Sequence, residues 1–341
     1  MPTDYNKTKS ERRILLIGGG GYVGSVLTQY LLERGIFVRC LDSLLYDNNA
    51  AVESFLGHPN YEFVYGDFCD DQLLQKSSDD VSDVVLLAGL VGDPITKKYP
   101  QASETINEAG VQGCFDSLAG KGIGRLIFIS TCSNYGLMEG DQLATEESEL
   151  NPLSLYAKAK VDAEQKLLSL RGEVDYHPTI LRFATAFGLS PRMRFDLTVN
   201  EFTRELAMGE ELLVFDADTW RPYCHVRDFS RLILKVLEME PEKVSFEVFN
   251  AGGDTNNSTK RGIVEAILEQ LPNAKVCYKQ HGTDPRNYRV DFRKVREVLD
   301  FEPTYGVPDG IAELIAQLNN HVFRNLTGRE NFFGNYEIQN F

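Results

Sequence analysis

Short apolar runs alternate, along the first half of the chain, with segments whose apolar residues recur at helical spacing. Runs suited to a buried parallel strand occupy 13–17, 37–41, 63–65, 84–87, 126–129 and 179–181. Between the first two runs, the apolar residues at 23, 26, 27, 30 and 31 fit one face of a helix, and Gly35 ends it. Strands that alternate with helices in this way predict an α/β fold with a doubly wound parallel sheet.

After about residue 185 the alternation becomes irregular, which predicts a second, smaller lobe. Helix-like runs lie at 200–208, 229–237, 263–271 and 311–318, and strand-like runs at 212–215, 247–250 and 275–278. We therefore expect a first domain at 1–185, to which a segment near 225–250 returns, and a second lobe mainly formed by 186–341. The tail at 322–341 is aromatic, and we expect it to pack either on its own subunit or on a neighbour.

A run of glycines separates the first strand from the first helix. Gly19, Gly21 and Gly24 fit G-x-G-x-x-G, while Gly18, Gly21 and Gly24 fit G-x-x-G-x-x-G, and spacing alone does not choose. Both patterns describe a tight turn that brings a pyrophosphate against a helix N-terminus. Asp42 ends the second strand, where a carboxylate accepts hydrogen bonds from the adenosine ribose and repels a 2′-phosphate. The pattern therefore predicts NAD rather than NADP, the alternative being a glycine-rich loop without a ligand.

Charge and composition narrow the choice of partners. The 341 residues include 35 Lys and Arg and 50 Asp and Glu, so the net charge is -15. This acidity argues against nucleic acid or an anionic membrane as the main partner. Any site for an anionic substrate must then rest on a local cluster of arginines.

Cysteine and histidine positions bear on compartment and metal. The six cysteines include no C-x-x-C pair, which predicts free thiols in a reducing compartment. The five histidines show no metal-ligand spacing, so we expect no catalytic metal. No run reaches membrane-spanning length. The N-terminus has basic residues before an apolar stretch, as a signal peptide does, but glycines interrupt that stretch. We therefore expect a cytoplasmic protein, in which the N-x-S/T triplets starting at Asn6, Asn256, Asn257 and Asn325 have no meaning.

The segment SLYAKAK places Tyr156 and Lys160 one helical turn apart on one face. A neighbouring ammonium stabilises the phenolate, so we expect a lowered pKa for Tyr156, as a general base toward a substrate hydroxyl requires. The same spacing also occurs in helices where the tyrosine is merely half-buried and the lysine is solvated.

The segment FISTCSNYG ends a predicted strand at Ser130 and Thr131. This point lies at the carboxyl edge of a parallel sheet, where ligands bind in such folds. A hydroxyl there could hold the reacting oxygen while the tyrosine takes its proton, although a Ser/Thr cluster also commonly begins a loop.

With these motifs, nearly the whole chain to about residue 320 resembles the extended short-chain dehydrogenases/reductases that act on nucleotide-sugars. The resemblance implies a Rossmann domain, bound NAD and the G-x-x-G-x-x-G spacing. It also aligns Asn107 and Val111, imperfectly, with a helix motif of the family. The catalytic residues that it implies are Thr131, Tyr156 and Lys160. The cofactor-binding residues that it implies are Gly18, Gly21, Tyr22, Val23, Asp42, Asp67, Phe68, Ala88, Gly89, Leu90 and Lys160.

The second lobe also resembles this family in its arginine motifs. TWRPYCHVRD contains Arg221 and TDPRNYRVD contains Arg286, which resemble positions that bind the diphosphate of a sugar nucleotide. A planar guanidinium binds phosphate in a bidentate way. SPRMRFD adds Arg192 and Arg194 as weaker candidates, and a surface ion pair is the alternative for each arginine. The substrate-binding residues that we expect are Val91, Ser133, Arg192, Arg221 and Arg286.

The reaction that the resemblance implies is oxidation or reduction at a hydroxyl of the sugar, and we expect this hydroxyl to be the one at C4. An epimerase is the favoured activity. A one-way dehydrogenase or 4-ketoreductase, for example on a nucleotide-activated heptose or deoxysugar, is the alternative. Related 4,6-dehydratases place Asp and Glu after the catalytic threonine, whereas Cys132 and Ser133 stand here, so dehydration is disfavoured. Cys132 is either a proton donor or a packed thiol. Related epimerases carry asparagine at the position of Thr185, so the motif does not identify the sugar.

Two other readings compete with a nucleotide-sugar enzyme. In a non-enzymatic NAD sensor we expect the tyrosine or the lysine to be replaced by another residue, but Tyr156 and Lys160 are both present. A steroid or flavonoid reductase of the same superfamily would lack Arg221 and Arg286. The family also implies a homodimer that is formed through two helices of each subunit, one of which carries Tyr156.

Overall fold

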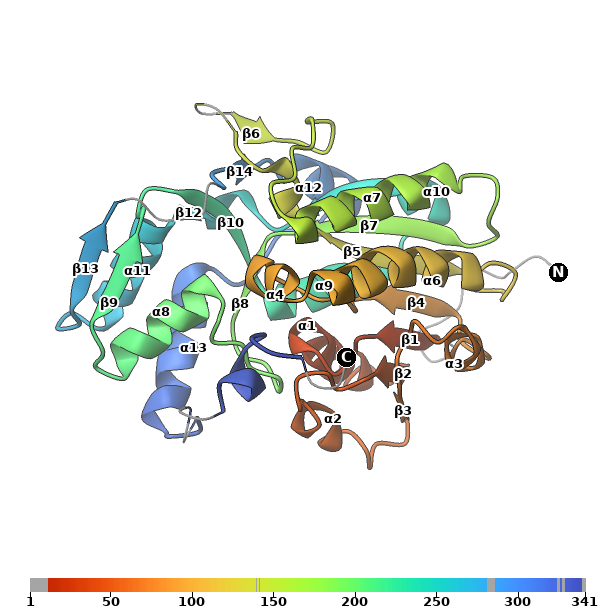
Figure 1. Ribbon diagram of the computed structural model, residues 1–341, viewed down its shortest axis with the longest axis horizontal. Coiled ribbons are helices and arrows are strands. Elements are labelled where there is room, and N and C mark those ends of the chain that lie inside the picture. Colours follow the sequence, from red (N-terminus) through yellow and green to blue (C-terminus); the bar gives the residue numbers. More distant parts are fainter. Residues whose placement is uncertain are drawn as a thin grey trace.

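The computed structural model describes residues 12–138, 140, 142–280, 286–323, 326 and 329–338. Asn6 and Asn325, and the parts of the tail 322–341 that are not in this list, lie outside the described residues. The main sheet has seven parallel strands in the order β11-β7-β5-β4-β1-β2-β3 (Figure 1). The strands are β1 (Arg13–Ile17), β2 (Phe37–Asp42), β3 (Tyr61–Tyr65), β4 (Asp83–Leu86), β5 (Arg125–Thr131), β7 (His177–Phe183) and β11 (Glu247–Ala251).

Helices cover both faces of this sheet, which confirms the doubly wound architecture. Alternate residues of β1 face opposite ways, so that Ile14 and Leu16 join one buried cluster and Leu15 and Ile17 join the other. The first cluster includes side chains from α1 (Tyr22–Leu32), α9 (Val226–Glu238) and α12 (Arg293–Leu299). The second includes side chains from α3 (Asp71–Ser77), α6 (Val111–Ser117) and α7 (Leu155–Ser169).

The remaining helices of this part are short. They are α2 (Ala50–Glu53), α4 (Asp93–Lys98), α5 (Pro100–Ser103), the π-helix η2 (Glu104–Gly110), the 3₁₀ helix η3 (Cys132–Tyr135) and α10 (Pro241–Val244). Both η3 and α4 follow strands of the sheet at the edge where the candidate site lies.

A second lobe lies beside the sheet and has its own buried cluster (Figure 1). Its strands are β8 (Thr185–Phe187), β9 (Leu212–Phe215), β10 (Trp220–His225), β12 (Asn257–Thr259) and β13 (Val276–Lys279). Its helices are α8 (Thr198–Ala207), α11 (Lys260–Gln270), α13 (Val307–Asn319) and the 3₁₀ helix η4 (Asp254–Asn256). In this lobe β12, β10 and β8 form one sheet in that order, and β13 pairs with β9. A further two-stranded pair, β6 (Leu143–Ala144) with β14 (Arg289–Val290), lies in contact with β10. The chain returns from this lobe to the main sheet as β11, beside β7.

The described part of the C-terminal tail packs on its own chain, between α13 and α1 (Figure 1). It includes the 3₁₀ helix η5 (Glu330–Phe333), and Phe333 is buried against Phe195, with ring centroids 5.8 Å apart. The Phe333 carbonyl accepts a hydrogen bond from the Phe195 amide at 2.7 Å, and Ile338 is buried in a core cluster of the first domain. The tail therefore connects the second lobe to the first.

The described residues contain neither a membrane-spanning helix nor a cluster of metal ligands. None of the helices there is both long and apolar enough to cross a membrane. No group of three or more His, Cys, Asp or Glu side chains in those ranges could hold a metal ion. The six cysteines are free thiols, four of them buried.

Candidate functional site

The glycine turn between β1 and α1 is packed too closely for side chains. Gly18 has a φ of +88°, and a Cβ there would lie 2.7 Å from the Ala88 amide nitrogen. A Cβ on Gly24 would overlap the Gly18 carbonyl oxygen. Gly21 begins α1 with no side-chain cap and no acidic residue in the first turn. The helix N-terminus therefore presents free N–H groups, which suit the pyrophosphate of a dinucleotide.

Asp42, at the end of β2, is fixed against this turn. Its carboxylate accepts hydrogen bonds from the Gly20 amide at 2.9 Å and the Leu44 amide at 2.8 Å. Burial raises the pKa of Asp42, and these two amides oppose the rise. Asp67, from the turn after β3, accepts the Cys69 amide at 2.9 Å, and Phe68 beside it is buried. The acidic group predicted for the ribose therefore lies beside the glycine turn.

The segment after β4 is fixed by an amide side chain from another helix. Asn107, in η2, accepts a hydrogen bond from the Leu90 amide at 2.8 Å and donates one to the Leu90 carbonyl at 3.0 Å. Gly89 has a φ of +151°, which L side chains rarely adopt. This pair of hydrogen bonds holds Ala88, Gly89 and Leu90 beside Gly18 and gives a physical role to the imperfect helix motif.

The three predicted catalytic residues lie together at the carboxyl end of β5. Ser154 caps α7, so that Tyr156 occupies its first turn and the Lys160 side chain returns under the strand. The Lys160 ammonium donates to the Ile129 carbonyl at 2.7 Å and lies 6.0 Å from the centre of the Tyr156 ring. The Thr131 side chain lies close enough to Tyr156 to lower the pKa of the phenol, although burial has the larger, opposite effect.

The expected lowering of the Tyr156 pKa is wrong for the protein without cofactor. Burial raises the pKa of Tyr156 above its usual value and outweighs the charges around it. Burial also lowers the pKa of Lys160 to about 7, so that the lysine is itself only partly charged near neutral pH. The sequence analysis considered the ammonium but not the removal of both groups from water.

Arg194 supplies a second positive charge that the sequence analysis did not connect with the tyrosine. Of the charges that lower the pKa of Tyr156, that of Arg194 has the largest effect, and Arg286 also contributes. Arg194 is buried and paired with Asp196, so its position is fixed. A bound cofactor with a positively charged ring would add to this field.

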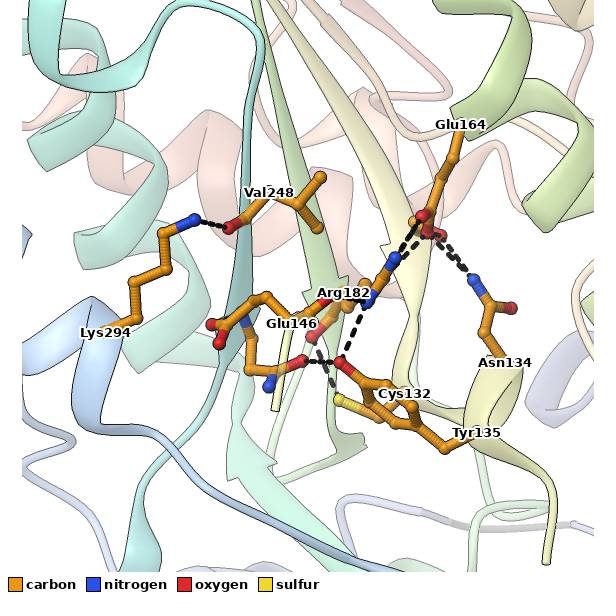
Figure 2. Close-up of polar contacts among 10 residues, drawn as sticks. Cys132, Asn134, Tyr135, Glu146, Glu164, Arg182, Val248 and Lys294 are labelled. Atoms are coloured by element: carbon orange, nitrogen blue, oxygen red, sulfur yellow. Dashed lines mark hydrogen bonds and ion pairs between the residues drawn. The ribbon is translucent and has the colours of Figure 1, made fainter. Parts of the chain in front are cut away.

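A buried ion pair between Glu164 and Arg182 is the centre of a polar network in the interior (Figure 2). Glu164, one turn after Lys160 on α7, pairs with Arg182 of β7 at 2.7 Å. Glu164 also accepts hydrogen bonds from the Ser130 hydroxyl and the Asn134 amide, and Arg182 donates to the Tyr135 hydroxyl at 2.9 Å. The network joins α7, β5, β7 and η3. The sequence analysis missed it, although the spacing of Lys160 and Glu164 on one helix face was a usable signal.

Cys132 belongs to this interior and not to the reacting groups. Its thiol donates to the Arg182 carbonyl at 3.1 Å, and burial raises the pKa of Cys132. Ser133 instead lies beside the catalytic threonine, because its hydroxyl is 2.8 Å from that of Thr131. These contacts support the packed-thiol alternative for Cys132.

The predicted substrate arginines fall into two groups. Arg221 contacts the Arg286 carbonyl, and Arg286 forms an ion pair with Asp93 of α4 at 3.0 Å. These two therefore lie together, near Tyr156. Arg192 instead interacts with Asp42 and lies 5.2 Å from the centre of the Tyr46 ring, beside the glycine turn.

The chain is similar to known proteins over most of its length. Residues 14–252 match the NAD dependent epimerase/dehydratase family. The low-salt glycan biosynthesis protein Agl12 of Haloferax volcanii is 30% identical over 87% of this chain and 96% of its own. A dTDP-glucose 4,6-dehydratase of Streptomyces griseus is 27% identical over 90% of this chain and 94% of its own.

Solved structures show the same fold. UDP-glucose 4-epimerase of Thermotoga maritima, solved with UDP-glucose, superposes with a TM-score of 0.80 at 25% identity and covers 91% of this chain and 99% of its own. The chain belongs to the NAD-dependent epimerase/dehydratase family, whose members modify nucleotide-sugars, and NAD is its cofactor.

Proposed function

We propose that this protein is a nucleotide-sugar 4-epimerase, which oxidises the C4 hydroxyl of a nucleotide-diphosphate sugar and then reduces the ketone from the other face. The observation that carries the proposal is that Thr131, Tyr156 and Lys160 lie together at the carboxyl end of β5. Two adjacent hydroxyl groups at this edge can bind one sugar oxygen between them.

The proton steps use residues of this chain. Tyr156 as phenolate takes the proton of the C4 hydroxyl, while Thr131 holds the same oxygen, and the C–H bond gives up a hydride. NAD, when bound, supplies the hydride acceptor and a positive charge beside the phenol. Arg194 lowers the cost of the phenolate, which burial makes high in the free protein. The Lys160 ammonium, 6.0 Å from the centre of the ring, would act in the same direction when it is charged.

The arrangement of Arg221 and Arg286 supports a diphosphate substrate. Arg286 is held by Asp93, and the Arg221 side chain contacts the Arg286 backbone. A pair of guanidinium groups in a protein of net charge -15 is the local cluster that an anionic substrate requires.

A one-way C4 dehydrogenase or a 4-ketoreductase is the second candidate, because the first half-reaction is the same. Dehydration at C5 and C6 is disfavoured, because Cys132 is buried with a raised pKa and Ser133 has no acidic group. The relative from Streptomyces griseus bears a dehydratase name, so this point needs its own measurement.

The test supplies UDP-, dTDP- and GDP-sugars with NAD and follows both the products and the reduced-nicotinamide absorbance. We expect one sugar to be converted to its C4 epimer without net NADH. Accumulation of NADH with a 4-keto product would instead indicate the dehydrogenase. Loss of the C6 hydroxyl, or no turnover and no thermal stabilisation by any of these sugars, would contradict the proposal.

We further propose a cytoplasmic homodimer that is formed through α7. Leu153 and Leu155, at the start of this helix, are 42% and 45% exposed, although leucines are usually buried. Light scattering after gel filtration should give twice the chain mass, and a single chain mass would contradict the dimer.

A further inference from the structure

Arg192 is a buried cation with unused hydrogen-bonding capacity. Its side chain is 3% exposed, and Nη2 donates to the Gly334 carbonyl at 2.8 Å. Nη1 is buried and has no hydrogen-bond partner among the described residues. No ion pair joins Arg192 to a carboxylate within those ranges, although Arg194, two residues later, pairs with Asp196.

A second unused polar group lies beside it. The guanidinium of Arg192 is 5.2 Å from the centre of the Tyr46 ring, and the Tyr46 hydroxyl is also buried without a partner in the described structure. Tyr46 belongs to the segment that follows Asp42 at the end of β2 and that also supplies Asn48. Asn48 donates to the Gly20 carbonyl at 2.7 Å, which ties this segment to the glycine turn.

Burial of an unpaired guanidinium is costly, so its retention points to an anion that completes the site. Burial lowers the pKa of Arg192 to about 10, and the neighbouring charge of Arg194 adds to this effect. The anion that fits the adjacent helix N-terminus is a phosphate group. The substrate arginines, Arg221 and Arg286, lie elsewhere, near Tyr156 and Asp93.

The C-terminal tail holds Arg192 in this position. The Gly334 carbonyl accepts a hydrogen bond from the Arg192 guanidinium. The neighbouring Phe333 carbonyl accepts one from the amide of Phe195, which lies in the same loop as Arg192. Asn335 donates to the Val91 carbonyl at 3.2 Å, and its amide donates to Asp196 at 3.3 Å. The tail thus fixes a loop of the second lobe against the segment that follows β4.

We propose that Arg192 binds the pyrophosphate of NAD from the second lobe, with the C-terminal residues 330–338 as its support. Arg192 is then a cofactor-binding residue, and not the substrate-binding residue that the sequence analysis expects. The inference rests on NAD as the cofactor and not on the epimerase reaction, so the two can fail separately.

The test measures the dissociation constants of NAD, ADP, adenosine and UDP by calorimetry for the full chain and for Arg192→Gln. Because Arg192→Gln loses a charge-assisted hydrogen bond to phosphate, the dissociation constants of NAD and ADP should rise by about 10- to 100-fold. Adenosine, which has no phosphate, and UDP, which stands for the substrate diphosphate, should change by less than about twofold. If Arg192→Gln binds UDP more weakly but binds ADP with unchanged affinity, Arg192 belongs to the substrate site. If all four dissociation constants are unchanged, Arg192 has only a structural role. Either result overturns the proposal.

Three further variants separate binding from folding. Arg192→Lys keeps the charge and should recover part of the ADP affinity that Arg192→Gln loses. Tyr46→Phe removes only a hydroxyl and should weaken NAD and ADP severalfold. Arg261→Gln, which breaks an exposed pair with Asp218 in the second lobe, is the matched control and should leave all four constants unchanged. Equal ADP affinity in Arg192→Gln and Arg192→Lys, both folded by circular dichroism, would contradict a role for the charge.

Discussion

Arg182 and Glu164 form an ion pair at 2.7 Å in the interior, with side-chain exposures of 5% and 2% (Figure 2). The pair joins β7 to α7, the helix that carries Tyr156 and Lys160. It thereby fixes the helix on which the two proposed catalytic residues lie.

Glu164→Gln should destabilise the protein by about 3–5 kcal/mol, because the buried Arg182 charge loses its counter-charge. Urea unfolding measures this change. Glu62→Gln, which breaks the half-exposed pair of Glu62 with Arg39, is the control and should cost less than about 1 kcal/mol. Equal costs for the two variants would show that the interior pair has no special role.

Gly18→Ala should reduce NAD affinity tenfold or more, because the Cβ would overlap the Ala88 backbone and Gly18 has a φ of +88°. Gly113→Ala is the matched control, since Gly113 lies in α6 with open space around it. This control should raise the free energy of unfolding by about 0.5–1 kcal/mol and leave NAD affinity unchanged. Unchanged NAD binding in Gly18→Ala would refute the steric argument.

Most of the strands could be predicted because parallel strands buried on both faces read as continuous apolar runs. The run at 13–17 coincides with β1, and the run at 126–129 lies within β5, where both faces of the strand are buried. The spacing of Tyr156 and Lys160 likewise led to their shared helix, since a four-residue separation fixes the face. Both inferences depend only on local periodicity.

The remaining features depend on contacts between distant segments. Arg192 and Arg194 are equivalent in the sequence SPRMRFD, but one faces the segment after β2 and the other pairs with Asp196. The direction of the Tyr156 pKa shift depends on burial, which its own helix does not determine. Such outcomes follow from tertiary packing and not from spacing.

The free energy of unfolding should rise with pH through the buried Lys160. Its pKa is about 7 in the folded chain against an ordinary value of 10.5, so between these values only the unfolded chain binds the proton. The contribution of Lys160 is therefore unfavourable below pH 7, and it improves by up to about 1.4 kcal/mol per pH unit above it.

Urea unfolding of the wild type and of Lys160→Met between about pH 7 and about pH 9 measures this effect as a difference. We expect the wild type to gain stability relative to the variant as pH rises. Parallel curves would mean that the lysine keeps an ordinary pKa in the folded protein.

Thr131→Val removes the hydroxyl that lies beside Tyr156 and keeps the shape of the side chain. We expect kcat on the converted nucleotide-sugar to fall about 10- to 100-fold, because one hydrogen bond to the reacting oxygen is lost. Thr203→Val is the control, since the Thr203 hydroxyl is buried and bonds the Val199 carbonyl of its own helix. An equal loss of kcat in the two variants would point to folding and not to chemistry.

The most direct test of the account replaces the phenol itself. For Tyr156→Phe, kcat should fall by about 10²–10⁴-fold while the dissociation constant of NAD stays unchanged, because the phenyl ring packs but transfers no proton. Tyr176→Phe is the control, as its buried hydroxyl bonds the Phe115 carbonyl within the first domain, and it should retain activity. A Tyr156→Phe protein that converts the sugar within about twofold of the wild-type rate would contradict the assignment of the proton step to Tyr156.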